Sequence, residues 1–334
     1  MSRKKNSRQW ARLRVLCSTG LPLMTIVPDA FALVRELIPN TAATLFLRAD
    51  SPDAREQQAL DDTVVAALPP PNGYYFSDSS SFAAVREDDY EHVIDQPLEH
   101  GAEALGTVTL LRNGPAFDAD DEEDLGRVAT YFEFALRNAS APATGLSGVI
   151  EDEAMLLATT GGHILFLSDS AGAMLDQLAL QERAAFDRLK LPPFGLRLVE
   201  SVMYGDRYPW RLPSSTLAMA GGVLEARAQW MSSGGLSLAS SLQADHSRTI
   251  GIFLKYVVPM PLRIWRALST VELSPQQMEV AYWMGVGGGR EAARARMDVS
   301  DAVLRDCVKA VYEKFGCTSE AGLLAILRPA VSRM

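Results

Sequence analysis

Cysteine and histidine are scarce in this sequence. Its 334 residues contain four histidines and three cysteines, Cys17, Cys307 and Cys317. An odd number of widely separated cysteines provides neither a disulfide framework nor the paired spacing of a zinc site. The histidines are equally scattered, so no metal centre and no cofactor are expected. Unpaired cysteines fit a reducing compartment, and we expect a cytoplasmic protein.

Long apolar runs and enzyme motifs are missing as well. No run approaches the ~20 apolar residues that a membrane-spanning helix needs, so no membrane partner is expected. The N-terminal residues 1–10 are basic but lack the apolar centre of a secretory signal. The chain contains no nucleophile elbow, phosphate-binding loop or metal-ligand pair, which argues against an enzyme.

The chain also lacks an overall excess of basic residues. Its formal net charge of −9 does not point to nucleic acid for the chain as a whole. The charge is unevenly distributed, however, because residues 274–334 carry eight Lys and Arg against seven Asp and Glu. The acidity therefore lies in the preceding part, and each domain has to be judged by its own charge.

The N-terminal part of the chain mixes helix and strand patterns. Residues 50–100 are polar and predict long loops around one or two short strands. Residues 105–114 have the pattern of a strand that ends in a turn, and the acidic run Asp118–Asp124 then opens a long helix, since carboxylates stabilise the positive end of a helix. This ending resembles the C-terminal half of a GAF domain over residues 28–138, with another α+β domain as the alternative. Residues 1–27 are expected to form a basic, helical segment.

A stretch of small residues, 139–150, is the strongest boundary in the chain and predicts a linker. After it, residues 161–175 have the pattern of a strand followed by the first turn of a helix. Residues 223–231 and 249–257 alternate as strands of an antiparallel sheet do. The pattern resembles a PAS domain over residues 151–258, with a second GAF-like or degenerate α+β sensor domain as the alternative.

Both resemblances imply small α/β sensor modules that bind ligands or pair with one another. Aromatic side chains are candidates for lining an apolar ligand pocket, although packing in the core explains them equally well. The candidate ligand-binding residues are Tyr74, Tyr75, Tyr204, Trp210 and Trp230.

The C-terminal segment has the clearest helix signals. A connecting helix is expected over residues 259–271. Ser274 and Gln277 then form a capping box, with Pro275 in the first helical position. Gly285 and the three glycines at 287–289 end this helix.

Two further helices flank a short turn. Residues 290–296 form a short second helix, and Ser300 can cap a third one. Gly316 supplies the left-handed residue that ends the third helix, and a fourth helix follows over 319–327. The buried stripe of the third helix is Leu304, Val308, Val311 and Phe315.

Short helices with a tight turn before an exposed, polar third helix are typical of a helix-turn-helix, whose recognition helix enters the major groove. Residues 273–317 also resemble, without gaps, the four-helix DNA-binding domain of the LuxR/GerE family. Val303 and Cys307 stand where that family has threonine and histidine, so two DNA contacts are missing. The expected fold is therefore an α+β multidomain protein: GAF-like and PAS-like antiparallel-sheet domains, followed by an all-α helix-turn-helix domain over 272–334.

Candidate DNA-binding residues follow from the resemblance and from helix geometry. Arg305 is the candidate for reading a base edge, because arginine pairs bidentately with guanine. Lys309 lies one turn further on and can reach a base or a phosphate. A solvated surface charge is the alternative for each. The remaining candidates are Arg290, Arg296 and Lys314 as phosphate contacts, with Ser300 and Asp301 at the start of the third helix.

These observations predict a transcription regulator that binds double-stranded DNA as a homodimer. In one hypothesis, a small-molecule effector bound by the N-terminal modules controls DNA binding. In the alternative, these modules bind no ligand and serve only dimerisation or protein contacts. RNA polymerase is an expected partner if the protein activates transcription.

Overall fold

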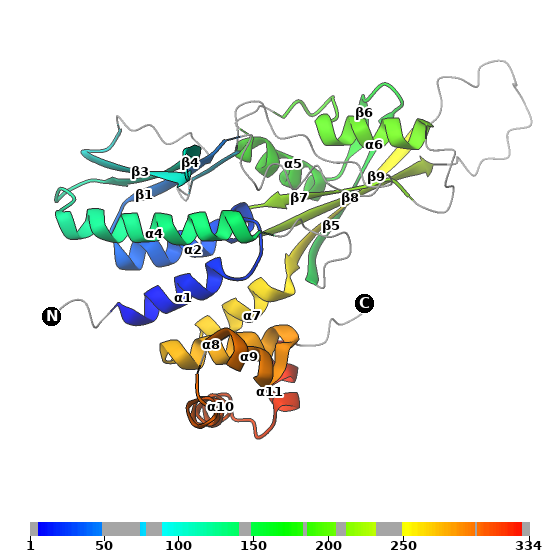
Figure 1. The fold of residues 1–334 in the computed structure, drawn as a ribbon. Helices are drawn as coiled ribbons and strands as arrows, with labels where there is room; N and C mark the ends of the chain where they lie inside the picture. Colours follow the sequence, from blue (N-terminus) through cyan, green and yellow to red (C-terminus); the bar gives the residue numbers. More distant parts are fainter. Residues whose placement is uncertain are drawn as a thin grey trace, which may run out of the picture.

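The computed structural model describes residues 6–48, 74–77, 89–139, 148–182, 186–204, 212–231, 249–297 and 299–328. In this part the chain forms two antiparallel sheets, each accompanied by helices, and a helical C-terminal segment (Figure 1). The prediction of a mixed α and β protein with two antiparallel sheets before a helical segment is confirmed.

Among the described residues, the first sheet has four strands in the order β2-β1-β4-β3, and all neighbours are antiparallel. Its strands are β1 (Ala42–Leu47), β2 (Tyr74–Ser77), β3 (His92–His100) and β4 (Glu103–Arg112). The accompanying helices are α1 (Ser7–Cys17), α2 (Leu23–Leu37) and α4 (Ala119–Asn138). Helices α2 and α4 cover one face of this sheet, and α1 lies outside them (Figure 1). The ring of Phe31 on α2 lies 6.1 Å from Phe132 on α4 and 5.7 Å from Phe76 on β2, which ties the layers together.

The acidic run before α4 is a helix start, as predicted. The side chain of Asp118 accepts the backbone N–H of Asp121 at 2.9 Å, and the carboxylate of Asp121 accepts the N–H of Asp118 at 3.3 Å. Arg112 pairs with Asp121 at 3.0 Å and so joins the end of β4 to this cap. These bonds satisfy N–H groups that the first turn of a helix leaves without partners.

The described part of the second sheet has five strands in the order β6-β5-β9-β8-β7, again with antiparallel neighbours. Helices α5 (Asp169–Gln181) and α6 (Pro193–Tyr204) cover one of its faces (Figure 1). Together they enclose a hydrophobic core of their own. The strands are β5 (Gly148–Thr159), β6 (Ile164–Leu167), β7 (Ser214–Met219), β8 (Gly222–Met231) and β9 (Thr249–Pro259).

Strand β5 and helix α6 were not predicted from the sequence. The first half of β5 carries the exposed acidic residues 151–153 and therefore lacks the alternation of a half-buried strand. β5 starts at Gly148, inside the stretch predicted as a linker, and pairs with β9 along its length. Its place in the sheet depends on a partner far away in the sequence.

The C-terminal segment consists of helices joined by short turns in its described part. Its elements are α7 (Met260–Ser269), α8 (Pro275–Trp283), η2 (Met284–Gly288), which is kinked at Gly287, α9 (Gly289–Met297), α10 (Asp301–Phe315) and α11 (Glu320–Leu327). The predicted capping box of Ser274 and Gln277 is present in both directions. Gly287 and Gly316 have φ angles of 101° and 63°, and such left-handed positions favour glycine.

One hydrophobic core joins the first sheet and its helices to the C-terminal segment. It includes Trp10 and Leu13 of α1, Leu262 of α7, Met278 of α8 and Val311 of α10. Helix α1 contacts α2 and α4 on one side and α7 and α8 on the other. The boundary predicted between residues 27 and 28 falls inside α2. The first sheet domain and the helical segment are thus packed together.

Candidate nucleic-acid interface

Helix α10 lies at the end of the molecule farthest from the two sheets (Figure 1). Leu304, Val308 and Val311 are buried, as the sequence stripe predicted, and Cys307 is buried with them. Phe315, the last member of the predicted stripe, is only half-buried. Ser300 caps the helix by accepting the N–H of Val303. The helix therefore packs with one face on the helical segment and leaves the opposite face exposed.

Three of the candidate cations line one hollow beside α10. Arg290, Arg305 and Lys309 border a cavity of about 340 Å³ together with Tyr312 and Glu313. Arg290 donates a hydrogen bond from Nη2 to the hydroxyl of Tyr312 at 3.2 Å, and this bond raises the pKa of Arg290. The guanidinium is therefore held in place and remains charged.

The other two cations of the hollow, Arg305 and Lys309, are held less firmly by their contacts within the protein. Arg305 donates from Nε to the carbonyl oxygen of Asp301 at 3.2 Å, which leaves its terminal nitrogens to other acceptors. The ammonium of Lys309 lies 4.0 Å from the carboxylate of Glu313, and its side chain is 79% exposed. Both side chains can reach a ligand outside the molecule.

The remaining candidates have contacts within the protein. Arg296 stacks over the ring of Trp283 at 3.9 Å from its centre. The ammonium of Lys314 donates to the side chain of Gln277 at 2.9 Å and to the carbonyl oxygen of Glu272, and so stabilises the start of α8. The contact of Lys314 with a DNA phosphate stays a prediction. Its bonds at the start of α8 give it a second, structural role.

Asp301 is paired with a residue that the sequence did not single out. Its carboxylate lies 3.0 Å from Nη1 of Arg294 on α9. The pair joins the two helices on either side of the turn. Because the alanine-rich sequence around Arg294 gave no sign of a partner, only the packing of α9 against α10 identifies it.

The aromatic ligand candidates are not brought together. Tyr74 and Tyr75 belong to β2 in the first sheet, whereas Tyr204 is on α6 and Trp230 on β8 of the second domain. The side chain of Tyr204 is 79% exposed and that of Trp230 is 40% exposed. Trp210 lies outside the described residues.

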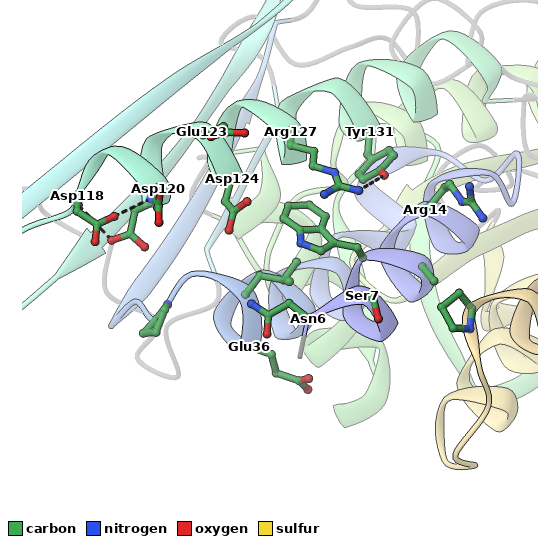
Figure 2. A pocket seen from close by; sticks show the side chains of 16 residues that line it. Asn6, Ser7, Arg14, Glu36, Asp118, Asp120, Glu123, Asp124, Arg127 and Tyr131 are labelled. Carbon is green, nitrogen blue, oxygen red and sulfur yellow. Dashed lines mark hydrogen bonds between the residues drawn. The ribbon is translucent and has the colours of Figure 1, made fainter. Parts of the chain in front are cut away.

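A cavity of about 880 Å³ lies instead between α1, α2 and the start of α4, with Pro275 of α8 at its rim. Asp118, Asp120 and Asp124 line the side formed by α4, and Asn6 and Arg14 belong to the side formed by α1 and the residue before it (Figure 2). Burial is the main cause that raises the pKa of Asp124. The sequence offered no signal for this cavity, because its walls come from distant parts of the chain.

An arginine sits between two aromatic rings in this cavity. The guanidinium of Arg127 lies 4.1 Å from the ring centre of Trp10 and donates to the hydroxyl of Tyr131 at 3.4 Å (Figure 2). Arg127 follows Asp124 by three residues on α4, and its charge acts against the upward shift of the pKa that burial causes at Asp124. Among the described residues, no three His, Cys, Asp or Glu side chains are grouped as a metal site requires.

Helix α1 joins this cavity to the helical segment. Arg14 lines the cavity and forms an ion pair with Glu279 of α8 at 2.6 Å. Arg8 donates to the carbonyl oxygen of Val271 at 2.8 Å, and the indole N–H of Trp265 donates to the carbonyl oxygen of Arg12 at 3.0 Å. A change in the position of α1 would therefore be transmitted to α7 and α8.

A second junction joins α2, α7 and the turn between β7 and β8. Arg266 bonds both carboxylate oxygens of Asp29, with Nη2 at 2.7 Å and Nε at 3.1 Å. Burial lowers the pKa of Arg266, but the hydrogen bonds and the charge of Asp29 outweigh it and the net shift is upward. Thr25 accepts the N–H of Gly221 through its carbonyl oxygen at 3.0 Å and donates to the carbonyl of Gly222 at 3.1 Å. Both sheet domains and α7 thus meet at one point.

Comparison with known proteins yields little. No family model and no curated protein matches the chain. Among solved structures, a chain described as the sensor region of a sensor histidine kinase matches with 14% identity and a TM-score of 0.22, over 70% of this chain and 90% of that one. This similarity is too weak to support an argument. Among the described residues, no helix is both long enough and apolar enough to cross a membrane.

Proposed function

We propose that the protein is a sequence-specific DNA-binding transcription regulator that places α10 in the major groove. The observation that carries the proposal is the hollow beside α10, where Arg290, Arg305 and Lys309 gather at the end of the molecule remote from both sheets. A helix of this kind, capped at its start and exposed on one face, is what a helix-turn-helix inserts into DNA. The resemblance to the LuxR/GerE domain agrees with this placement.

The three cations have different roles in this proposal. Arg305 reads a guanine edge through its terminal nitrogens, and Lys309 reaches a base or a phosphate one turn further on. Arg290, fixed by Tyr312, contacts a backbone phosphate, which positions the helix without specifying sequence. Arg296 is a further candidate for a phosphate contact.

Dimerisation is part of the proposal because one helical segment has little charge to offer. Its eight basic residues are nearly balanced by seven acidic ones, so attraction to the DNA backbone is modest. Two copies on adjacent half-sites double the contacts. We place the protein in the cytoplasm, and RNA polymerase is a partner if it activates transcription.

Control by the GAF-like and PAS-like domains is proposed in two forms. The cavity beside Trp10 favours a small-molecule effector, since Arg14 links its wall to α8. In the alternative, the domains bind no ligand and act through dimerisation and protein contacts, which the core shared with the helical segment favours. Native mass spectrometry of the full chain separates them: a bound small molecule supports the first form. A ligand-free chain whose melting temperature ignores a metabolite panel supports the second.

Retention of DNA by variants tests the main proposal. The wild-type chain is used to select a binding sequence from a pool of random duplexes. Arg305→Ala is expected to weaken binding to the selected duplex roughly 5- to 100-fold, because a bidentate arginine–guanine pair is lost. Arg188→Ala, which removes an exposed arginine from the second sheet domain, is the control and should leave the affinity for the selected duplex unchanged. Unchanged affinity in Arg305→Ala, with the dimer intact in both variants, would show that Arg305 does not read DNA.

A further inference from the structure

Helix α10 carries three carboxylates, and two of them have cationic partners. Asp301 pairs with Arg294 at 3.0 Å, and Glu313 lies 4.0 Å from Lys309. No ion pair to Asp306 is formed by any other side chain in the described part of the chain. Asp306 is exposed, so its carboxylate faces solvent.

Asp306 also occupies the outermost face of the helix. It follows Ala302 by four residues and precedes Lys309 by three, and residues at these spacings share a helix face. All three are exposed, whereas Leu304 and Val311 define the buried side. Arg305 and Lys309 line the hollow, and Asp306 does not. A duplex that meets this face therefore meets the carboxylate.

A carboxylate in that position is selective because it can only accept hydrogen bonds. Phosphate groups repel it, and a charge that loses water without finding a donor is strongly unfavourable. In the major groove the base edges offer two donors, the N4 amino group of cytosine and the N6 amino group of adenine. Adenine places its N7 acceptor beside the amino group, where it faces the second carboxylate oxygen. Cytosine has no such acceptor, so it is the better partner.

We infer that Asp306 is a specificity-determining residue that selects a cytosine in the operator. The inference rests on the proposed DNA-binding function and deepens it. The small side chain of Ala302, one turn before Asp306, lets the helix approach the base edges closely. The carboxylate then favours one base pair and weakens binding to every duplex that lacks an amino group at that point.

The test is selection from a pool of random duplexes by the full chain and three variants. The wild-type motif is expected to contain one position with a strong preference for cytosine. In Asp306→Ala this preference should fall roughly 5- to 100-fold while the other positions stay as they are. In Asp306→Asn it should move to adenine, because asparagine pairs with N6 and N7 of that base. Glu291→Gln is the control, since it removes an equal charge from an exposed position on α9.

The outcomes separate the inference from the proposed function. A wild-type chain that enriches no sequence overturns the proposed function, and the inference with it. A wild-type motif that Asp306→Ala reproduces at every position overturns the inference alone. Equal broadening of the motif by Asp306→Ala and Glu291→Gln also overturns it, because the effect would then be one of general charge. Far-UV circular dichroism of each variant checks that the exposed substitutions leave the fold intact.

Discussion

The ion pair between Asp29 and Arg266 is expected to couple the first sheet domain to α7 far more strongly than an ordinary surface pair would. The chain supplies a matched comparison. Nη2 of Arg266 and Oδ2 of Asp29 are 2.7 Å apart, the same distance that separates Nη2 of Arg188 from Oδ2 of Asp176. The first pair has side chains 36% and 18% exposed, and the second pair 66% and 43%. The two ion pairs therefore differ in burial and in the second hydrogen bond, and not in the distance between the charged atoms.

The expected magnitudes follow from these differences. A hydrogen bond to a charged group contributes about 1.5–3 kcal/mol when it is shielded from water. The partial exposure of Arg266 reduces this, so we expect a coupling energy of about 1.5 kcal/mol between Asp29 and Arg266. Exposed pairs contribute about 0.2–1 kcal/mol, and the Arg188–Asp176 pair should lie at the lower end.

A double-mutant cycle measures both couplings. For each pair, the two single alanine variants and the double variant are unfolded in urea, and far-UV circular dichroism follows the loss of structure. Asp29→Ala and Arg266→Ala should each be more destabilising than the coupling energy itself, because each leaves a partly buried charge without its partner. Equal coupling energies in the two cycles would refute the reasoning that burial sets the strength of this junction.

Three further predictions concern stability and reactivity. Burial raises the pKa of Glu182 to about 6 from an ordinary 4.5, so the folded state binds its proton more tightly than the unfolded chain. The stability that the protonated Glu182 provides is fully present below pH 4.5 and is lost as the pH rises through 6. Glu182→Gln should therefore become more stable than the wild type across this window, by up to about 2 kcal/mol in urea titrations. A stability difference that does not change with pH would contradict the raised pKa of Glu182. Ser274→Ala removes the acceptor for the N–H of Gln277 and should destabilise α8 by about 1 kcal/mol, measured by the urea midpoint, whereas a neutral effect would mean that Lys314 holds the helix start alone. Cys17 is buried and its pKa is raised by burial, while Cys317 is half-buried, so mass-spectrometric mapping after brief alkylation of the folded chain should find Cys317 modified first; early labelling of Cys17 would show that α1 detaches readily.

Local signals in the sequence predicted the helical segment well. Ser274, Ser300 and Gly316 act on groups three or four residues away, so their capping roles can be recognised without knowledge of the rest of the chain. The same holds for the acidic start of α4 at Asp118. The buried stripe of α10 was also predictable, because helical periodicity places Leu304 and Val308 on one face.

Long-range packing decided what the sequence could not. Strand β5 forms because β9 pairs with it. Its first half is charged and does not alternate between apolar and polar residues, so the sequence pattern does not predict a strand there. The cavity beside Trp10 forms because α1 and α4 meet, and the ion pair of Arg14 with Glu279 spans most of the chain. No local pattern contains these contacts.

The candidate DNA-binding surface illustrates the same division. Which charged residues α10 carries and which of its faces is buried can be predicted without a structure, since both follow from composition and a period of about 3.6 residues. What those charges do depends on contacts between helices: Arg290 is fixed by Tyr312, Lys314 bonds the start of α8, and Asp306 forms no ion pair within the described part of the chain. Side-chain partners depend on how separate helices pack, and that packing is set by burial over the whole chain.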